Sequence, residues 1–244
     1  MCLMFCRVKQ SSLEYQLFGI AESRLDFRIT YNSISIPDYY IIRRHPQLPR
    51  QTGIYVYVHH SVQDITHRRK DLENDEIECI WLELKPHAFG LSLFVSYLYT
   101  NPAVTVEWYD SFVQMFDDVY KVKNCAGVLI LGHFNIDMLK PHSYWYSNLA
   151  LFGLAHLITS PTRTTPSSTS LIDHIYTNNP SAVVTTDVSD LSIGDHNPIS
   201  CTSAIKLPNR EPKGHTNVPF RSFKHFNQSA FFADLICTPF DNVH

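Results

Sequence analysis

Four short segments combine carboxylate, amide and histidine side chains with a neighbouring run of apolar residues. They are GIAESRL with Glu22, LGHFNID with His133, Asn135 and Asp137, SLIDHIYTN with Asp173 and His174, and SIGDHNPIS with Asp195 and His196. Carboxylate oxygens hold hard cations, and imidazole exchanges a proton near neutral pH. The apolar runs predict strands, and each segment is expected to place its polar group just past the end of one. Loops in that position usually carry the reactive groups of α/β proteins, so these residues are the candidates for a site.

Each segment also has an ordinary structural interpretation. An Asp-His pair in a loop more often forms a turn or caps a helix than reacts, and Glu22 can be a surface charge. Asn135 can serve as a turn residue, and Tyr99, at the end of the apolar run VSYLY, can pack on the core. The occurrence of all four segments in one chain is harder to attribute to chance than any one of them.

The elements that must position these groups are mainly strands. Apolar or alternating runs rich in β-branched and aromatic residues predict strands at 15–23, 53–58, 77–84, 91–99, 126–132 and 181–188. Apolar residues at helical spacing predict an amphipathic helix over 105–122, and a second helix is expected over 144–153. Residues 160–170, SPTRTTPSSTS, predict a loop because they are rich in Pro, Ser and Thr. Strands outnumber helices, which favours an α/β fold with a core of two sheets and helices outside.

Composition indicates one large domain. The 244 residues are 44% hydrophobic, which is enough for a sizeable core. The formal net charge of −3 is not the basic balance typical of a nucleic-acid-binding domain. Basic residues are nevertheless concentrated between positions 43 and 70 and again after position 205. Solvated surface charge is the ordinary interpretation of each one taken singly.

Cysteine spacing and hydropathy favour an intracellular protein, nuclear or cytoplasmic. The six cysteines include no CxxC pair, so buried free thiols are expected rather than disulfides or a zinc site. The opening MCLMFCRVKQ is interrupted by Arg7 and Lys9 and does not predict a signal peptide. No run approaches the roughly 18 apolar residues of a membrane span, so no membrane partner is expected.

Taken together, the four segments resemble the endonuclease/exonuclease/phosphatase superfamily, which has the DNase-I-like fold. More narrowly, they resemble the apurinic-type endonuclease domain of non-LTR retrotransposons, over about residues 15–202. GIAESRLDFRI is similar to the Glu-bearing opening of that domain, VSYLYTNP to a Tyr-containing strand end, and GLAHLITSPTRTT with STSLIDHIYTN to its closing half. The resemblance implies a four-layered α/β sandwich of two mostly antiparallel sheets with flanking helices. Apolar periodicity is lost after about residue 204, which places this domain at residues 1–204 and a linker or tail at 205–244.

The resemblance also implies a metal-dependent site. Glu22 would hold Mg²⁺ or Mn²⁺ as an oxygen ligand, and Asp195 would serve a second or shifting metal position. Asp173 would orient His196, whose other ring nitrogen would face the scissile phosphate. The implied partner is DNA, and no small-molecule cofactor is implied.

Asn135, Tyr99 and His133 complete the implied catalytic set. Asn135 would present its amide to the phosphate or to the attacking water, and Tyr99 would donate its hydroxyl to a phosphate oxygen. The family has Gly-Asp-Phe-Asn where this chain has GHFN, so His133 occupies the position of the aspartate that serves the attacking water. Imidazole, with a usual pKa of about 6.5, can still accept a proton, but its protonated form repels a cation. We expect His133 to face the cleft, to add little to core packing, and to impair activity rather than abolish it.

Two further departures from the family concern the front of the chain. The family opens with a strand that ends in an asparagine, and MCLMFCRVKQSSLEYQ contains none, so that strand is expected to be replaced or missing. Arg24 stands where these domains commonly carry Trp or another apolar residue.

Three functions remain open from the sequence: a metal-dependent DNA endonuclease of retroelement type, a phosphatase or phospholipid-cleaving enzyme of the same superfamily, and an inert remnant that folds and binds nucleic acid. Thr162 and Arg163, ahead of the Asp173 segment, favour the retroelement branch. His133 and the absent front asparagine favour the inert remnant. The chain ends at His244 without a reverse-transcriptase segment, as expected for a fragment or a decayed copy of an element.

Overall fold

The computed structural model describes residues 1–8, 15–25, 28–46, 51–85, 90–103, 105–140, 143–191 and 194–204. The linker or tail expected at 205–244 lies outside these residues. Two six-stranded sheets, here called sheet A and sheet B, form most of the described structure, and a two-stranded hairpin accompanies them.

Sheet A is built from both ends of the described chain. Its strands, in the order β13-β14-β1-β2-β4-β3, are Val183–Val188, Ile199–Ser203, Cys2–Arg7, Leu17–Ala21, Ile54–His59 and Tyr39–Arg44. Its β1 and β14 are parallel, and its other neighbouring pairs are antiparallel. This topology puts the segments before β14 and after β2 at one edge of the sandwich.

Sheet B is built from the middle of the chain. Its strands, in the order β5-β6-β7-β8-β12-β9, are Thr66–Arg68, Glu78–Leu84, Ser92–Tyr99, Cys125–His133, Asp173–Thr177 and Ala155–His156. The one parallel pair, β7 with β8, is joined by a crossover that contains helix α1 (Val106–Tyr120). The expectation of two mostly antiparallel sheets is therefore confirmed.

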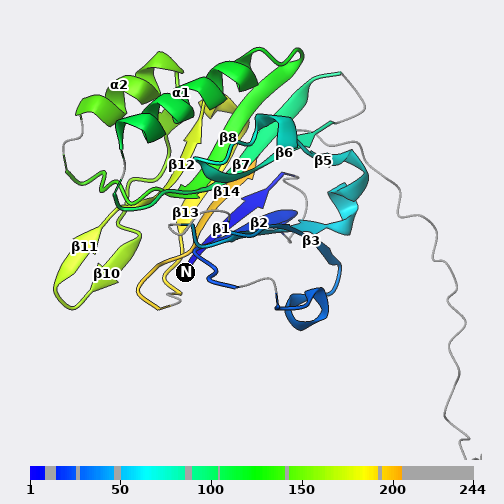
Figure 1. The fold of residues 1–244 in the computed structure, drawn as a ribbon, viewed down its shortest axis with the longest axis horizontal. Helices are drawn as coiled ribbons and strands as arrows, with labels where there is room; N and C mark the ends of the chain where they lie inside the picture. Colours follow the sequence, from blue (N-terminus) through cyan, green and yellow to red (C-terminus); the bar gives the residue numbers. More distant parts are fainter. Residues whose placement is uncertain are drawn as a thin grey trace, which may run out of the picture. The chain divides into compact units, whose positions relative to one another are not determined.

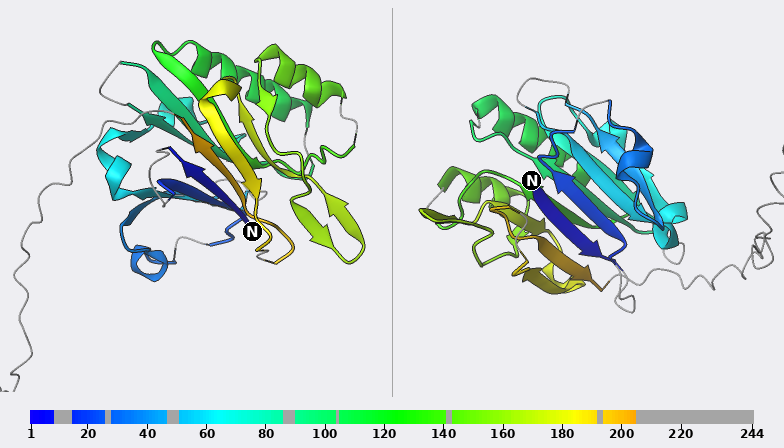
Figure 2. Two further views of the ribbon diagram at one scale, coloured as in Figure 1. Left: turned by 180° about the vertical axis from the view of Figure 1, so that it is seen from behind. Right: turned by 90° about the horizontal axis from the view of Figure 1, so that it is seen from below.

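The two sheets pack face to face around an apolar core. This core includes Val56 and Leu17 from sheet A and Leu82, Val95 and Leu131 from sheet B, all fully or almost fully buried. Figures 1 and 2 show the two layers from three sides. At Gly19 in β2 the contact is so close that an added Cβ would overlap the ring of Tyr97 in β7. Only glycine fits there, which fixes how the sheets approach one another.

Both α-helices of the described residues cover the outer face of sheet B (Figure 1). Helix α1 begins after Thr105, whose hydroxyl accepts a hydrogen bond from the backbone of Trp108, and it buries Phe112 and Phe116 against the sheet. Helix α2 (Ser143–Leu151) buries Trp145 in the same layer. The predicted helices and their outer position are thus confirmed, with sheet B as the face that they cover. Neither helix is long and apolar enough to cross a membrane.

Short 3-10 helices occupy several connections. They span Tyr31–Ile34, His60–Ile65, Lys70–Leu72 and Pro180–Ala182. None of the four contributes a side chain to the lining of the site described below.

The prediction of a loop at 160–170 is wrong in part, because this segment contains a β-hairpin. Strands β10 (Arg163–Thr165) and β11 (Ser168–Ser170) pair antiparallel across a short turn. The hydroxyl of Thr165 accepts a hydrogen bond from the backbone N–H of Ser168 and stabilises that turn. Pro and Ser composition marked the turn, while the threonines that flank it favour strands.

The front of the chain forms a strand within sheet A. In β1 the side chains of Cys2, Met4 and Cys6 are buried in alternation with less buried neighbours, the usual pattern of a strand with one face in the core. Cys2 pairs with Ala21, so β1 begins beside the end of β2 and runs away from it. A strand is therefore present at the front, but it supplies no asparagine.

Candidate active site

A cleft of about 600 Å³ opens where the two sheets meet at one edge. Six of the seven predicted site residues line it, namely Glu22, Tyr99, His133, Asn135, Asp195 and His196. The seventh, Asp173, lies fully buried directly behind His133 and His196. All seven residues are therefore gathered at one place, although their roles stay predictions.

Strand pairing explains how distant segments meet. Glu22 follows β2 directly, and Asn135 lies two positions after the end of β8. The expectation that Asp173 follows a strand is wrong, because Asp173 is the first residue of β12. It still reaches the same edge, since β12 is antiparallel to β8 and Asp173 is the register partner of His133. Asp195 likewise lies in the connection ahead of β14 rather than directly after a strand.

The carboxylate of Asp173 joins the two histidines of the cleft. Its Oδ1 lies 2.7 Å from Nδ1 of His133, and its Oδ2 lies 2.8 Å from Nδ1 of His196. Burial alone would raise the pKa of the Asp173 carboxyl, but the hydrogen bonds from both rings and their charge hold it below its usual value. An ionised carboxylate only accepts hydrogen bonds, so both Nδ1 atoms carry a proton, and the lone pair of each ring in its neutral form is on Nε2. Nε2 of His196 also lies 4.0 Å from Oδ1 of Asp195.

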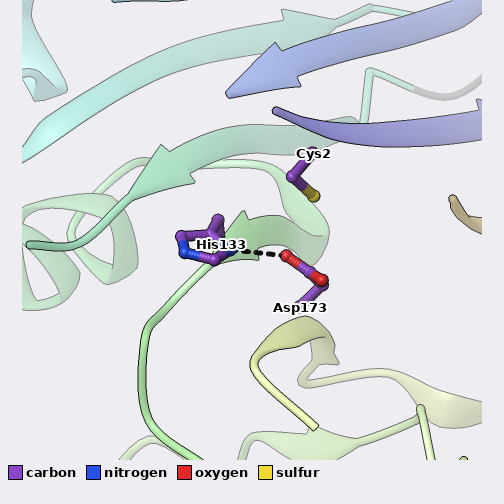
Figure 3. Close-up of side chains that lie close together, drawn as sticks. All are labelled: Cys2, His133 and Asp173. Atoms are coloured by element: carbon purple, nitrogen blue, oxygen red, sulfur yellow. Dashed lines mark hydrogen bonds and ion pairs between the residues drawn. The ribbon is translucent and has the colours of Figure 1, made fainter. Parts of the chain in front are cut away.

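A thiol completes the surroundings of this carboxylate. Cys2, at the start of β1, lies close to His133 and Asp173 (Figure 3). Burial is the main cause that raises the pKa of the Cys2 thiol, and the charge of Asp173 raises it further. Cys2 is therefore a neutral thiol, and a thiolate ligand is not expected at this position.

His133 is held more firmly than the sequence suggested. It lines the cleft, but its exposed fraction is only 3%, and its ring stacks on that of Tyr99 with the centroids 5.5 Å apart. The expectation that it adds little to packing is therefore wrong, because His133 is the last residue of β8 and not a loop residue. Gly132 before it has no space for a side chain, since a Cβ there would lie 2.8 Å from the carbonyl oxygen of Leu98.

Glu22 and Asn135 both adopt backbone conformations that are uncommon for residues other than glycine. Each has a φ of 55°, in the left-handed region, and such conformations concentrate at functional sites. The amide of Asn135 donates to the carbonyl oxygen of Thr100 at 2.6 Å, which fixes the direction of its side chain. The turn at Asn135 means that the backbone after His133 is not extended.

The backbone that follows Glu22 is anchored by a buried carboxylate that the sequence reasoning missed. Glu78, the first residue of β6, accepts hydrogen bonds from the backbone N–H groups of Thr52 and Gly53. The carbonyl oxygen of Thr52 in turn accepts from the backbone of Arg24 at 2.8 Å. Burial is the largest influence on Glu78 and raises the pKa of its carboxyl. A glutamate at the head of an apolar predicted strand was the available signal.

Three ion pairs with arginine or the N-terminus flank the cleft. The guanidinium of Arg24 lies 2.6 Å from Oε1 of Glu22, the N-terminal ammonium of Met1 lies 3.4 Å from Oε2 of Glu22, and the guanidinium of Arg163 lies 2.6 Å from Oδ2 of Asp195. In both carboxyls burial opposes ionisation, but the hydrogen bond from the arginine leaves the pKa below its usual value. Glu22 and Asp195 are therefore charged in neutral solution.

Thr162 connects the hairpin segment to the buried carboxylate. Its fully buried hydroxyl accepts hydrogen bonds from the backbone N–H groups of Ile172 and Asp173, at 3.2 and 3.0 Å. Its carbonyl oxygen accepts from the backbone of Asn197 at 2.8 Å. Thr162 thus positions the backbone at Asp173 and also the backbone that follows His196.

Besides Asp173, two polar residues named in the candidate segments, Asp137 and His174, do not line the cleft. Asp137 accepts hydrogen bonds from the backbone of Leu139 and Leu171. His174 is fully buried, stacks on Phe134, and has its pKa lowered to about 3, mainly by burial. Both residues are structural, which agrees with the ordinary interpretation of such segments.

The donor set of the cleft fits a divalent cation. One ligand atom from each of Glu22, His133 and His196 lies within 4.8 Å of the others. The carboxylate of Glu22 suits Mg²⁺, which is commonly held by one or two carboxylates together with waters and substrate phosphates. Asp195 is in neither three-residue cluster of possible metal ligands among the described residues, and its Oδ2 is bound to Arg163.

Comparison with solved structures identifies the fold. The endonuclease domain of TRAS1, a telomere-specific non-LTR retrotransposon, matches with a TM-score of 0.54 and 15% identity over 66% of this chain and 78% of that one. The catalytic domain of human nocturnin matches with a TM-score of 0.52 and 14% identity over 75% of this chain and 78% of that one. A mannosyl-6-phosphatase of Bacteroides thetaiotaomicron matches with a TM-score of 0.50 and 18% identity over 69% and 77%.

The chain has the fold of the endonuclease/exonuclease/phosphatase proteins, as its resemblance to them predicted. No family model matches the sequence, and no curated protein matches it either. At these identities the similarity establishes the fold, and the chemistry has to be argued from the cleft.

Proposed function

We propose that this chain hydrolyses phosphodiesters as a metal-dependent DNA endonuclease of the non-LTR retrotransposon type. The observation that supports it best is the cleft in which a carboxylate, Glu22, faces two histidines that share the buried carboxylate of Asp173. Hydrolysis of a phosphodiester needs a cation beside the phosphate, an acceptor for the proton of water, and donors for the phosphate oxygens. The cleft offers a group for each of these.

The proton acceptor is an imidazole nitrogen. The oxygen of a water molecule attacks phosphorus while its proton passes to Nε2 of a neutral histidine ring, either His133 or His196. The new P–O bond forms, the bond to the leaving oxygen breaks, and that oxygen takes a proton from solvent. Asp173 keeps each ring in the tautomer that accepts at Nε2 and stabilises the imidazolium that results.

Donors from the rim of the cleft position the phosphate. Asn135, held by Thr100, presents its remaining amide hydrogen, and the hydroxyl of Tyr99 donates to a phosphate oxygen. Burial is the main cause that raises the pKa of the Tyr99 hydroxyl. The hydroxyl is therefore protonated in neutral solution and can donate a hydrogen bond. Glu22 would hold Mg²⁺ or Mn²⁺, and the ion would neutralise charge on the phosphate.

DNA is the substrate that the sequence and fold favour together. Thr162 and Arg163 match the sequence motif of the retroelement branch, and one similar structure is itself a retrotransposon endonuclease domain. A phosphatase activity is the alternative, since one similar structure is a mannosyl-6-phosphatase. His133 in the place of an aspartate is expected to lower the rate rather than remove it.

A nicking assay on supercoiled plasmid tests the proposal. Conversion to the open circle should rise with Mg²⁺ concentration and fall by about 10²-fold or more in Glu22→Gln. The matched control is Glu107→Gln, an exposed carboxylate at the start of α1. Release of phosphate from sugar phosphates without nicking would move the assignment to a phosphatase. A folded protein with neither activity, whatever the metal, would establish the inert remnant.

A further inference from the structure

We propose that Glu22, His133 and His196 together bind a divalent transition-metal ion, with Zn²⁺ as the best fit, through one carboxylate oxygen and two imidazole nitrogens. The three ligand atoms lie within 4.8 Å of one another. Tetrahedral Zn²⁺ holds such atoms roughly 3.4 Å apart, so small side-chain rotations close the site. The inference rests on the proposed function for the use of the ion, but binding can be tested without catalysis.

The tautomers of the two rings are fixed in the form that metals bind. Both Nδ1 atoms donate to Asp173, at 2.7 and 2.8 Å, which leaves a lone pair on each Nε2. A histidine ligand commonly donates its second nitrogen to a carboxylate, which fixes the ring and makes it a stronger ligand. Here one buried carboxylate serves both rings, so the two nitrogens are oriented together before any ion binds.

The mixture of donors decides which ion binds best. Mg²⁺ prefers oxygen ligands, whereas imidazole nitrogen suits Zn²⁺ and its neighbours among the transition metals. Two histidines and one glutamate are also a known ligand set of catalytic zinc sites, in which water takes the fourth position. An aspartate at position 133 would instead give two carboxylates and favour Mg²⁺. The residue at position 133 therefore selects the ion.

Two ion pairs at Glu22 do not block the site. The guanidinium of Arg24 lies 2.6 Å from Oε1 and the N-terminal ammonium of Met1 lies 3.4 Å from Oε2, and the side chains of Arg24 and Met1 are 76% and 44% exposed. Exposed ion pairs of this kind contribute little, so a divalent cation displaces both groups into solvent. Both histidines are almost fully buried, which limits competition from water at their free nitrogens.

Ligation changes what the two rings can do. A ring whose Nε2 lone pair is bound to an ion cannot also accept a proton from water. With Mg²⁺ held by Glu22 the rings remain proton acceptors, and with Zn²⁺ they become ligands. The two ions therefore use the same residues in different ways.

Titration calorimetry on the full chain, freed of metal with a chelator, tests the inference without DNA. We expect one Zn²⁺ per chain, bound at least about 100-fold more tightly than Mg²⁺. Replacing a ligand, in His196→Gln or Glu22→Gln, should weaken Zn²⁺ binding by about 100-fold or more, while His60→Gln, an exposed histidine away from the cleft, should not change it. Circular dichroism establishes that each variant is folded.

The absorption spectrum of bound Co²⁺ provides a second measurement. We expect the intense visible bands of a four-coordinate ion in the parent and their loss in His133→Asn. Zn²⁺ affinity that is unchanged in all three ligand variants, or tighter binding of Mg²⁺ than of Zn²⁺, would overturn the inference. An inactive nuclease that binds Zn²⁺ as described would contradict the proposed function and leave the metal site standing. Nicking in Mg²⁺ without Zn²⁺ binding would do the reverse.

Discussion

His133 and Asp173 are register partners in neighbouring strands, and Nδ1 of the histidine lies 2.7 Å from Oδ1 of the aspartate. The pairing of β8 with β12 therefore sets their distance, and no flexible loop intervenes. The second oxygen of the same carboxylate binds His196, which precedes a strand of the other sheet. One buried carboxylate thus connects the two sheets at the cleft and orients both imidazoles.

Asp173→Asn should show how much the orientation of the two imidazoles by this carboxylate contributes to metal binding and to nicking. Its amide oxygen accepts from one ring, but its NH₂ group faces the other Nδ1, so one histidine loses its orientation. We expect metal affinity and nicking rate to fall by about 10–100-fold each. Asp187→Asn, an exposed change on β13, is the control and should be neutral. Unchanged binding and rate in a folded Asp173→Asn protein would show that the rings are oriented by their surroundings alone.

Thr162 offers a test of how the carboxylate itself is positioned. Thr162→Val keeps the shape but leaves the buried N–H groups of Ile172 and Asp173 without their acceptor. The free energy of unfolding should fall by about 1–3 kcal/mol, and nicking should fall with it. Thr162→Ser keeps the hydroxyl and should lose about 1 kcal/mol at most. Urea unfolding of the pair measures the difference, and equal stabilities would contradict this role.

The close approach of the sheets at Gly19 can be tested in the same way. In Gly19→Ala the new methyl group overlaps the ring of Tyr97, and we expect a loss of about 1–3 kcal/mol or more in unfolding free energy. Gly127→Ala is the matched control, because its Cβ would meet Asn179 at an ordinary 3.4 Å. Adding Tyr97→Leu to Gly19→Ala should recover part of the loss, and no recovery would place the strain elsewhere.

The sequence predicted the long central strands well, because each is a long apolar run that no turn residue interrupts. It predicted the helix over 105–122 for the same reason, since α1 buries residues at helical spacing. The hairpin at β10 and β11 was missed, because strands of three residues have no measurable periodicity. Strand β12 was missed as an element, although its first residue, Asp173, was already a candidate.

The candidate residues could be named from their segments, but their connections could not. That Asp173 binds two histidines depends on the register between β8 and β12, and register is a property of the folded sheet. The burial of His133 follows from Tyr99 and Asp173, which lie on neighbouring strands and are far away in sequence. Glu78 and Thr162 accept hydrogen bonds from backbone N–H groups. Every residue except proline has such a group, so the sequence does not show which of them these side chains bind.

Acid should destabilise the protein through two histidines of sheet B, of which His174 is fully buried and His156 is partly buried. Burial lowers the pKa of His156 to about 4 and that of His174 to about 3, from a usual value of 6.5. Between these pH values the unfolded chain binds more protons than the folded chain. The contribution of these rings to the free energy of unfolding is therefore complete above pH 6.5 and falls as the pH drops toward 4. Asp173, whose pKa is lowered, contributes a loss only below the usual range of a carboxyl.

His156→Gln isolates the contribution of one of these rings. The loss of unfolding free energy between neutral pH and pH 4.5 should be smaller than in the parent by on the order of 2 kcal/mol. Urea unfolding at the two pH values measures it as a difference of differences, so that groups common to both proteins cancel. An identical loss in the variant would mean that His156 becomes accessible to protons before the protein unfolds.

The residue at position 133 should determine which metal supports activity. In His133→Asp the ring that stacks on Tyr99 and donates to Asp173 is replaced by a second carboxylate beside a buried one. The metal-free variant should therefore lose about 1–3 kcal/mol of unfolding free energy, and Mg²⁺ should restore part of it. A carboxylate accepts the proton of water and also attracts Mg²⁺, so nicking in Mg²⁺ should rise by roughly 10²-fold.

Zn²⁺ should behave in the opposite way, because His133→Asp removes one of its two nitrogen ligands. We expect Zn²⁺ affinity to fall while Mg²⁺ affinity rises. The control is His133→Asn, which removes the ring without adding charge and should weaken Zn²⁺ binding without raising Mg²⁺ affinity. Single-turnover nicking at matched folded fraction, with each ion in turn, gives the comparison. A variant that gains rate equally with both ions would show that position 133 acts as a proton acceptor alone and does not select the metal.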